Sequence, residues 1–240
     1  MTTVTERWLH VHTMWLPKSG HSSHEYEDAF AVSGLDTVQS PADSRTFRAA
    51  VADGATETAF SGPWASRLAA SFVQHGSLES AVPNLRQSFK RRAQRRLPWY
   101  LEAKIEEGAH AAVLGLEIHG DETGRIWRAT AVGDCCLFHV SSGRDAATWP
   151  LDSPSAFNDT PALISSSADD PLPTFLASSG TWQVGDAFIL ATDALAAWLM
   201  SAGPAALLNG EDAFEDMVRD ARADGRMRDD DVTAVIAELR

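Results

Sequence analysis

Hydrophobic and polar residues alternate along several short stretches of the chain, and this alternation predicts β-strands. Such stretches occupy residues 6–16, 28–32 and 46–52, and three more follow Gly108: HAAVLGLEI, RIWRATAVGD and CCLFHV. Gly-Asp and Ser-Ser-Gly turns separate these last three, so we expect consecutive antiparallel strands there. Residues 186–192 and 232–239 predict two further strands close to the end of the chain.

Helical patterns lie between and after these strands. Pro63 is typical of the first turn of a helix, which would run through WASRLAASFVQ with Ser61 and Gly62 at its cap. Further helices are expected at residues 78–107, 195–200 and 212–223. This order of strands, helices, strands and helices, with no internal repeat or clear linker, predicts an α+β sandwich in a single domain over residues 1–240.

Two polar segments predict loops. Residues 19–25 are rich in Gly, Ser and His, and residues 150–180 are rich in Ser, Pro, Asp and Asn. The two histidines and Glu25 of the first loop permit a zinc site as an alternative interpretation. Their His-x-x-His spacing in a Gly/Ser setting differs from the helical His-Glu-x-x-His of zinc hydrolases, so we favour a solvated loop.

The chain is strongly acidic, with a formal net charge of -13. A polyanion would be repelled over most of such a surface, so general nucleic-acid binding is excluded. Most of the acidic residues are expected to be solvated surface. Clustered carboxylates are also the natural ligands of hard cations, so the acidic residues are the first place to look for chemistry.

The cysteines and the apolar runs indicate where the protein works. Cys135 and Cys136 are adjacent, and on a strand they would point to opposite faces, which disfavours a mutual disulfide. The longest apolar runs are far too short to span a membrane, and the first residues do not resemble a secretory signal. We therefore expect a reduced, cytoplasmic protein without a membrane anchor.

A run of basic residues stands out on this acidic chain: Arg86, Lys90, Arg91, Arg92, Arg95 and Arg96. The favoured interpretation is a solvated helix face whose charges pair with acidic residues such as Glu102 and Glu106. The alternative is a docking surface for an acidic or phosphorylated partner, because arginine binds phosphate in a bidentate manner.

Aspartates stand at the ends of four predicted strands that are far apart in the sequence. They are Asp28 in EYEDAF, Asp53 in RAAVADGAT, Asp193 in FILATDAL, and the residues 229–231 before the last strand. Each aspartate alone is compatible with a turn or cap residue. Four such strand ends meeting at one rim would instead form an oxygen-ligand site suited to Mg²⁺ or Mn²⁺.

Five motifs in order resemble those of the protein phosphatase 2C (PPM) family, in particular its bacterial branch. They are EDAF, VADGATE with SGPWAS, TAVGDCCLF, GDAFILATDAL and DDDVTAVI, within residues 20–239. The resemblance implies an α-β-β-α sandwich, in which two mainly antiparallel sheets are flanked by helices. It also implies a phosphatase that uses Mn²⁺ or Mg²⁺, as two core ions and a possible third, to remove phosphate from phosphoserine or phosphothreonine of a partner protein.

The same resemblance assigns metal-binding roles to Glu27, Asp28, Asp53, Gly54 (through its carbonyl), Asp134, Asp193 and Asp230. Asp53 would bridge the two core ions, Asp28 would hold a water, and Asp134 would bind the third ion. Asp28, Asp53 and Asp193 are the residues closest to the chemistry. Two cations would lower the pKa of a bridging water and neutralise phosphate oxygens during in-line attack, so no protein nucleophile is required.

The chain departs from the family pattern where the substrate phosphate is bound. Ser23 stands where the family has an arginine that grips the phosphate, and His24 is a candidate to replace part of that contact. Because the carboxylates are retained, the departure concerns substrate binding more than metal binding. The alternative function is a regulatory or pseudo-phosphatase module that binds a phosphoprotein without turnover, and a hydrolase of small phosphoesters is a third option.

Overall fold

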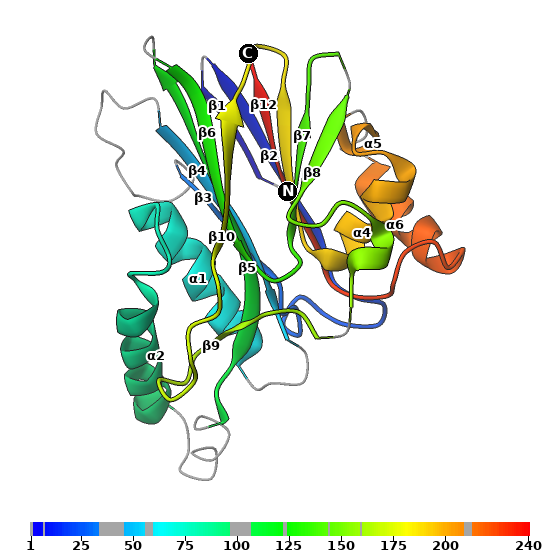
Figure 1. Cartoon of the computed structure of the whole chain (residues 1–240). Coiled ribbons are helices and arrows are strands. Elements are labelled where there is room, and N and C mark those ends of the chain that lie inside the picture. Colours follow the sequence, from blue (N-terminus) through cyan, green and yellow to red (C-terminus); the bar gives the residue numbers. More distant parts are fainter. Residues whose placement is uncertain are drawn as a thin grey trace.

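The computed structural model of the chain describes residues 2–6, 8–33, 46–55, 60–96, 107–121, 124–143, 145–158, 160–208 and 213–240. Two β-sheets face each other, and helices cover the outer side of each sheet (Figure 1). Every strand pair in both sheets is antiparallel. The predicted α-β-β-α sandwich is therefore confirmed.

Sheet A has the strand order β1-β2-β12-β11-β7-β8. Its strands are β1 (Thr2–Glu6), β2 (Leu9–Leu16), β12 (Val232–Leu239), β11 (Ala187–Ala191), β7 (Cys136–Val140) and β8 (Ala146–Trp149). Sheet B has the order β10-β6-β5-β4-β3, with β9 paired to β5. Its strands are β10 (Leu176–Thr181), β6 (Gly124–Val132), β5 (His110–Asp121), β4 (Thr46–Gly54), β3 (Ala29–Val32) and β9 (Ile164–Ser165).

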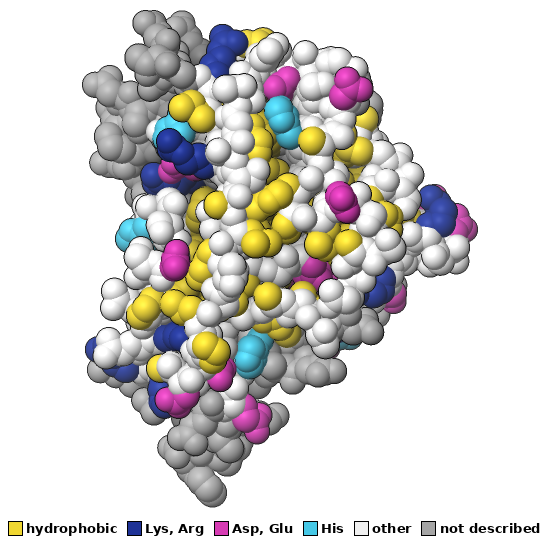
Figure 2. Space-filling view, in the orientation of Figure 1, with side chains coloured by type: hydrophobic (Ala, Val, Ile, Leu, Met, Phe, Trp, Pro, Cys, Tyr) yellow, Lys and Arg dark blue, Asp and Glu magenta, His cyan; other side chains and the backbone are white. Residues whose placement is uncertain are grey.

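The two sheets bury a common apolar layer because side chains alternate between the faces of each strand. In β12, Val235 and Leu239 pack between the sheets, whereas Ala234 and Ile236 face the helices outside sheet A. Adjacent Cys135 and Cys136 likewise enter different cores, and both are free thiols, as expected. Figure 2 shows apolar side chains reaching the surface between β10 and β7, where the seam between the sheets is visible.

Sheet B is covered by α1 (Ser61–His75) and α2 (Val82–Arg96) (Figure 1). Sheet A is covered by α4 (Asp193–Ala202), α5 (Ala205–Leu208) and α6 (Phe214–Ala223). A 3-10 turn, η2, spans Pro154–Ala156. In the described part of the chain, no helix has the length and apolar character needed to cross a membrane. Helix α1, which lies between β4 and β5 in the chain order, packs closely on sheet B, because β5 carries Gly115 beneath Phe72 of α1.

Three expectations about local structure differ from the observed fold. Strand β7 pairs with β11 and β8 in sheet A rather than with β6, because the chain crosses between the sheets at Gly133, whose φ of 95° is unfavourable for other residues. The segment 150–180 contains β9 and all but the last residue of β10, and β10 is the edge strand beside β6. The first helix begins at Ser61, so its N-cap is Phe60.

The basic run on α2 is only partly solvated. Lys90, Arg91 and Arg92 are exposed, as expected, but Arg86 is buried. Its guanidinium donates to the carbonyl oxygens of Ser165 and Asp170, each at 2.9 Å. Arg86 therefore fastens α2 to the segment around β9, while Glu102 and Glu106, which we expected to pair with the run, lie outside the described residues.

We predict that Gly115→Ala destabilises the protein by about 1–3 kcal/mol, the usual effect of overpacking a core. A Cβ at this position would lie 2.5 Å from ring atoms of Phe72, which is itself buried. Chemical denaturation measures the free energy of unfolding. Gly143→Ala is the matched control, because the nearest atom to its new Cβ lies 3.7 Å away. Equal stability of the two variants would contradict the close packing of α1 on sheet B.

Candidate metal centre

Strand ends from both sheets bring carboxylates together at one rim of the sandwich. Asp53 ends β4 in sheet B, Asp193 directly follows β11 in sheet A, and Asp134 lies in the turn where the chain crosses between the sheets. One carboxylate oxygen from each of the three lies within 4.8 Å of the others. The expected approach of Asp53 and Asp193 is thus present, and the crossing that sequence analysis missed is what delivers Asp134.

Asp28 is held in a fixed orientation by two threonines. Its Oδ2 accepts hydrogen bonds from Thr192 Oγ1 at 2.8 Å and from Thr233 Oγ1 at 2.7 Å. Thr192 Oγ1 also accepts from the backbone N–H of Thr233 at 3.0 Å. These bonds connect the segments before β3, after β11 and within β12, so the carboxylate that the resemblance places beside the metals is positioned by three strands at once.

Glu27 lies against the start of α1. Ser61 Oγ donates to Glu27 Oε1 at 2.8 Å, and the backbone N–H of Glu27 donates to Asp231 Oδ2 at 2.7 Å. Gly54 lies in the same corner, where an added Cβ would be 2.7 Å from the Glu27 carbonyl oxygen and 2.8 Å from Ser61 C. Only glycine therefore lets β4 approach the Glu27 backbone at this corner.

The segment before β12 contributes two aspartates with different surroundings. Arg228 forms ion pairs with Asp193 and with Asp230, the latter at 2.9 Å. Asp231 accepts from the backbone N–H groups of Lys18 at 2.9 Å and Glu27 at 2.7 Å. Asp230 is thereby turned toward the other acids, whereas Asp231 holds the chain segments around them.

We call Asp28, Asp53, Asp134, Asp193 and Asp230 the acidic centre. Burial raises the pKa of Asp53 well above its ordinary value, and the negative charges of the other four members raise it further. Burial and the charge of Asp193 raise the pKa of Asp134 to about 6. Like charges at this spacing disfavour full ionisation unless a cation offsets them.

The donor set of the acidic centre fits a hard divalent cation. It consists of carboxylate oxygens on strand ends, and oxygen donors are preferred by Mg²⁺ and Mn²⁺. The thiols of Cys135 and Cys136, which follow Asp134, are unsuited to act as nucleophiles. Burial raises the pKa of Cys136 to about 12 and that of Cys135 well above its ordinary value, so both remain protonated.

The candidate phosphate contacts lie in the loop between β2 and β3. Ser23 and His24 are exposed, and Glu25 closes the loop by accepting from the backbone N–H and hydroxyl of Ser22. Among the described residues, no hydrogen bond joins Ser23 or His24 to the acidic centre. The role of these two residues therefore stays a prediction.

Sequence analysis missed three contributors to the site. The sequence signal for Arg228 is its place two positions before Asp230. The signal for Thr192 is its place directly before Asp193. Tyr26 was the least visible, because its ring packs on Trp15 and its hydroxyl bonds to the side chain of Thr233. A search for threonines beside the strand-end aspartates would have found the partners of Asp28.

Solved structures of known proteins share this fold over nearly the whole chain. One is RsbX in complex with magnesium, with a TM-score of 0.60, 18% identity, and coverage of 100% of this chain and 99% of that one. The Mycobacterium tuberculosis serine/threonine phosphatase PstP/Ppp gives a TM-score of 0.65 at 15% identity, covering 97% and 99%. The S. agalactiae serine/threonine phosphatase gives 0.64 at 13% identity, covering 97% and 100%.

The chain therefore has the fold of the protein phosphatase 2C-type phosphatases. The resemblance drawn from the five motifs is confirmed at the level of the fold. Neither a protein-family model nor a curated protein matches the sequence.

We predict that Asp53→Asn stabilises the protein in EDTA but removes most of the stabilisation that Mn²⁺ gives the native chain. Without metal, the substitution relieves repulsion among the carboxylates, and each kcal/mol gained raises Tm by about 2–4 °C. With metal, the variant has lost a ligand, so binding to the folded state contributes less. Thermal melts of both proteins test this, with the exposed Asp145→Asn as the matched control. A lower Tm for Asp53→Asn in EDTA would contradict the electrostatic account.

Proposed function

We propose that the protein is a metal-dependent phosphomonoesterase that removes phosphate from phosphoserine or phosphothreonine of a partner protein. The observation that carries this proposal is the meeting of Asp53, Asp134 and Asp193 at the rim between the two sheets. Such a set of oxygen donors suits Mn²⁺ or Mg²⁺, with Asp53 and Asp193 serving two core ions and Asp134 a third. Divalent cations held there would activate a water and offset the charge of the phosphate.

The residues of the chain have separate tasks in this proposal. Asp53, Asp193 and Asp230 hold the cations, with Glu27 and the Gly54 carbonyl completing one side. Asp28 orients the attacking water, because Thr192 and Thr233 both donate to its Oδ2 and leave its other oxygen free of these bonds. Fixed acceptors of this kind reduce the reorganisation that the reaction requires.

A phosphoprotein substrate and a cytoplasmic setting complete the proposal. Two of the structurally similar proteins are described as serine/threonine phosphatases, and a third, PppA of Pseudomonas aeruginosa, as a key regulatory component of T6SS. The free, buried cysteines are compatible with a reducing compartment. We further propose that residues 1–240 act as one domain, since the two sheets share one core.

We expect the purified protein to hydrolyse p-nitrophenyl phosphate and a phosphothreonine peptide with Mn²⁺, and to lose this activity in EDTA. Asp53→Asn should lower kcat by about 100-fold or more, because it removes the charge of a metal ligand and keeps its shape. Absorbance of the released nitrophenolate measures the first reaction, and release of inorganic phosphate measures the second. A folded Asp53→Asn protein with native kcat would place the chemistry elsewhere.

A regulatory module that binds a phosphoprotein without turnover is the second candidate. Two observations favour it: Ser23 replaces the arginine expected to grip phosphate, and Arg228 already pairs with Asp193 and Asp230. The serine at position 23 would hold the phosphate of a substrate only weakly. The ion pairs of Arg228 place a cationic side chain at the aspartates that would otherwise bind metal. Absence of turnover by the Mn²⁺-loaded native chain would favour this module.

We predict a high KM for small phosphoesters that Ser23→Arg lowers by about tenfold, if the new contact contributes ~1.4 kcal/mol. A serine offers one neutral hydrogen bond, whereas an arginine offers two charge-assisted ones. Two comparison variants locate the native contact: His24→Ala and Arg228→Gln. A raised KM in only one of them identifies the residue that holds phosphate, and an unchanged KM in Ser23→Arg contradicts the placement of Ser23.

A further inference from the structure

A second group of metal-ligating side chains lies at the opposite end of the β2–β12 strand pair from the acidic centre. His10 and His12 are on β2, and Glu238 is on β12. The register pairs His10 with Glu238 and His12 with Ile236, so all three side chains are on the outer face of sheet A. We call these three residues the histidine site. Glu238 lies six positions after Val232 along β12, which places the site roughly 20 Å from the acidic centre at ~3.3 Å per residue.

The ligand atoms of the histidine site converge. His12 Nε2 lies 3.2 Å from His10 Nδ1, which lies 3.6 Å from Glu238 Oε2. One ligand atom from each of the three residues lies within 4.8 Å of the other two. A tetrahedral zinc ion with bonds of about 2.0–2.1 Å requires ligand atoms about 3.3–3.4 Å apart. The His10–His12 and His10–Glu238 separations bracket this value, and the His12–Glu238 pair lies within 4.8 Å, so a side-chain adjustment of about 1 Å brings the three residues onto one ion.

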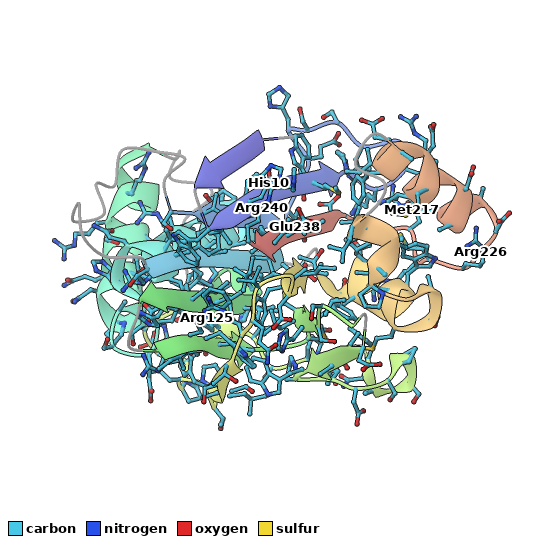
Figure 3. The ribbon with its side chains drawn as sticks, turned by 90° about the horizontal axis from the view of Figure 1, so that it is seen from above. His10, Arg125, Met217, Arg226, Glu238 and Arg240 are labelled. Atoms are coloured by element: carbon cyan, nitrogen blue, oxygen red, sulfur yellow. The ribbon has the colours of Figure 1, made fainter. Side chains whose placement is uncertain are left out.

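The last residue of the chain shows that this position favours a positive charge. Arg240 Nη2 is 2.7 Å from His10 Nδ1, and Figure 3 shows His10, Glu238 and Arg240 together over β2 and β12. A guanidinium nitrogen only donates, so the contact with Arg240 is a hydrogen bond in the tautomer that leaves Nδ1 of His10 unprotonated. An unprotonated imidazole is the form that binds metal.

We propose that His10, His12 and Glu238 bind a zinc ion that joins β2 to β12. Two imidazoles and one carboxylate suit Zn²⁺ better than Mg²⁺, which prefers oxygen donors only. His12 is 5% exposed and anchors the site, whereas Glu238 and Arg240 border an open hollow of about 270 Å³ through which an ion and a water as fourth ligand can enter. The exposed Arg240 side chain moves away as the ion binds.

The test is zinc titration by calorimetry of the native chain in excess Mg²⁺, which keeps the acidic centre filled. We expect one zinc ion per chain. His10→Ala and Glu238→Gln should each weaken binding by about 100-fold or more, because losing even an outer-shell partner costs about 10–100-fold. Both side chains are partly exposed, so these variants retain the packing of sheet A. His75→Ala, at an exposed histidine of α1, is the matched control and should bind zinc as the native chain does.

Two further measurements distinguish a metal site from a hydrogen-bonded cluster. Arg240→Gln removes the competing cation and should strengthen zinc binding several-fold, the opposite sign to His10→Ala. X-ray absorption at the zinc edge should show two imidazole ligands in the native chain and in Asp53→Asn, and fewer in His10→Ala. Native zinc affinity in His10→Ala and Glu238→Gln, or a zinc spectrum without imidazole, would overturn the proposal.

Discussion

Repulsion among closely spaced carboxylates is the constraint on which the acidic centre of this protein depends. Asp53 has four other aspartates as charged neighbours, and burial raises its pKa in the same direction as their charges. Such a group is costly to fold, because either the charges repel or protons must be taken up. The fold meets this cost by fixing the acids on strand ends that are buried in two cores. The packing of the two sheets thus offsets the electrostatic cost of the acidic centre, which is destabilising when no cation is bound.

Hydrogen bonds between distant chain segments hold Asp28 of the acidic centre and the neighbouring Asp231 in place. The Thr192 and Thr233 hydroxyls bond to one oxygen of Asp28, and Asp231 accepts backbone N–H groups from two other segments. Each of these contacts crosses between chain segments that are far apart in sequence. The rim is therefore a property of the assembled sandwich, and its geometry forms only when both sheets have paired. For this reason the site consists almost entirely of individual residues that lie at the ends of separate strands.

Local patterns were sufficient to predict most elements but not their partners. Strand β12 was expected at its observed bounds, because its apolar residues and preceding acids mark both ends. Strand β7 was expected beside β6, since a short turn normally makes a hairpin, yet Gly133 allows the chain to cross to the other sheet. The acids of the centre were named from their motifs. Arg228 and Asp231 were not assigned their roles, because an ion pair or a bond to a distant backbone N–H leaves no periodic signal.

The strand pair β2–β12 links the two cation sites that we infer. At one end of β12, Asp230 joins the acidic centre and Asp231 binds the backbone beyond β2; at the other end, Glu238 faces His10. Both ends carry acidic side chains close to an arginine, Arg228 at the first and Arg240 at the second. An arginine offsets negative charge without the fixed coordination geometry of a metal ion. In each site, therefore, the guanidinium and the cation compete for the same oxygens or lone pairs, and the affinity for metal depends on how readily the arginine side chain moves away.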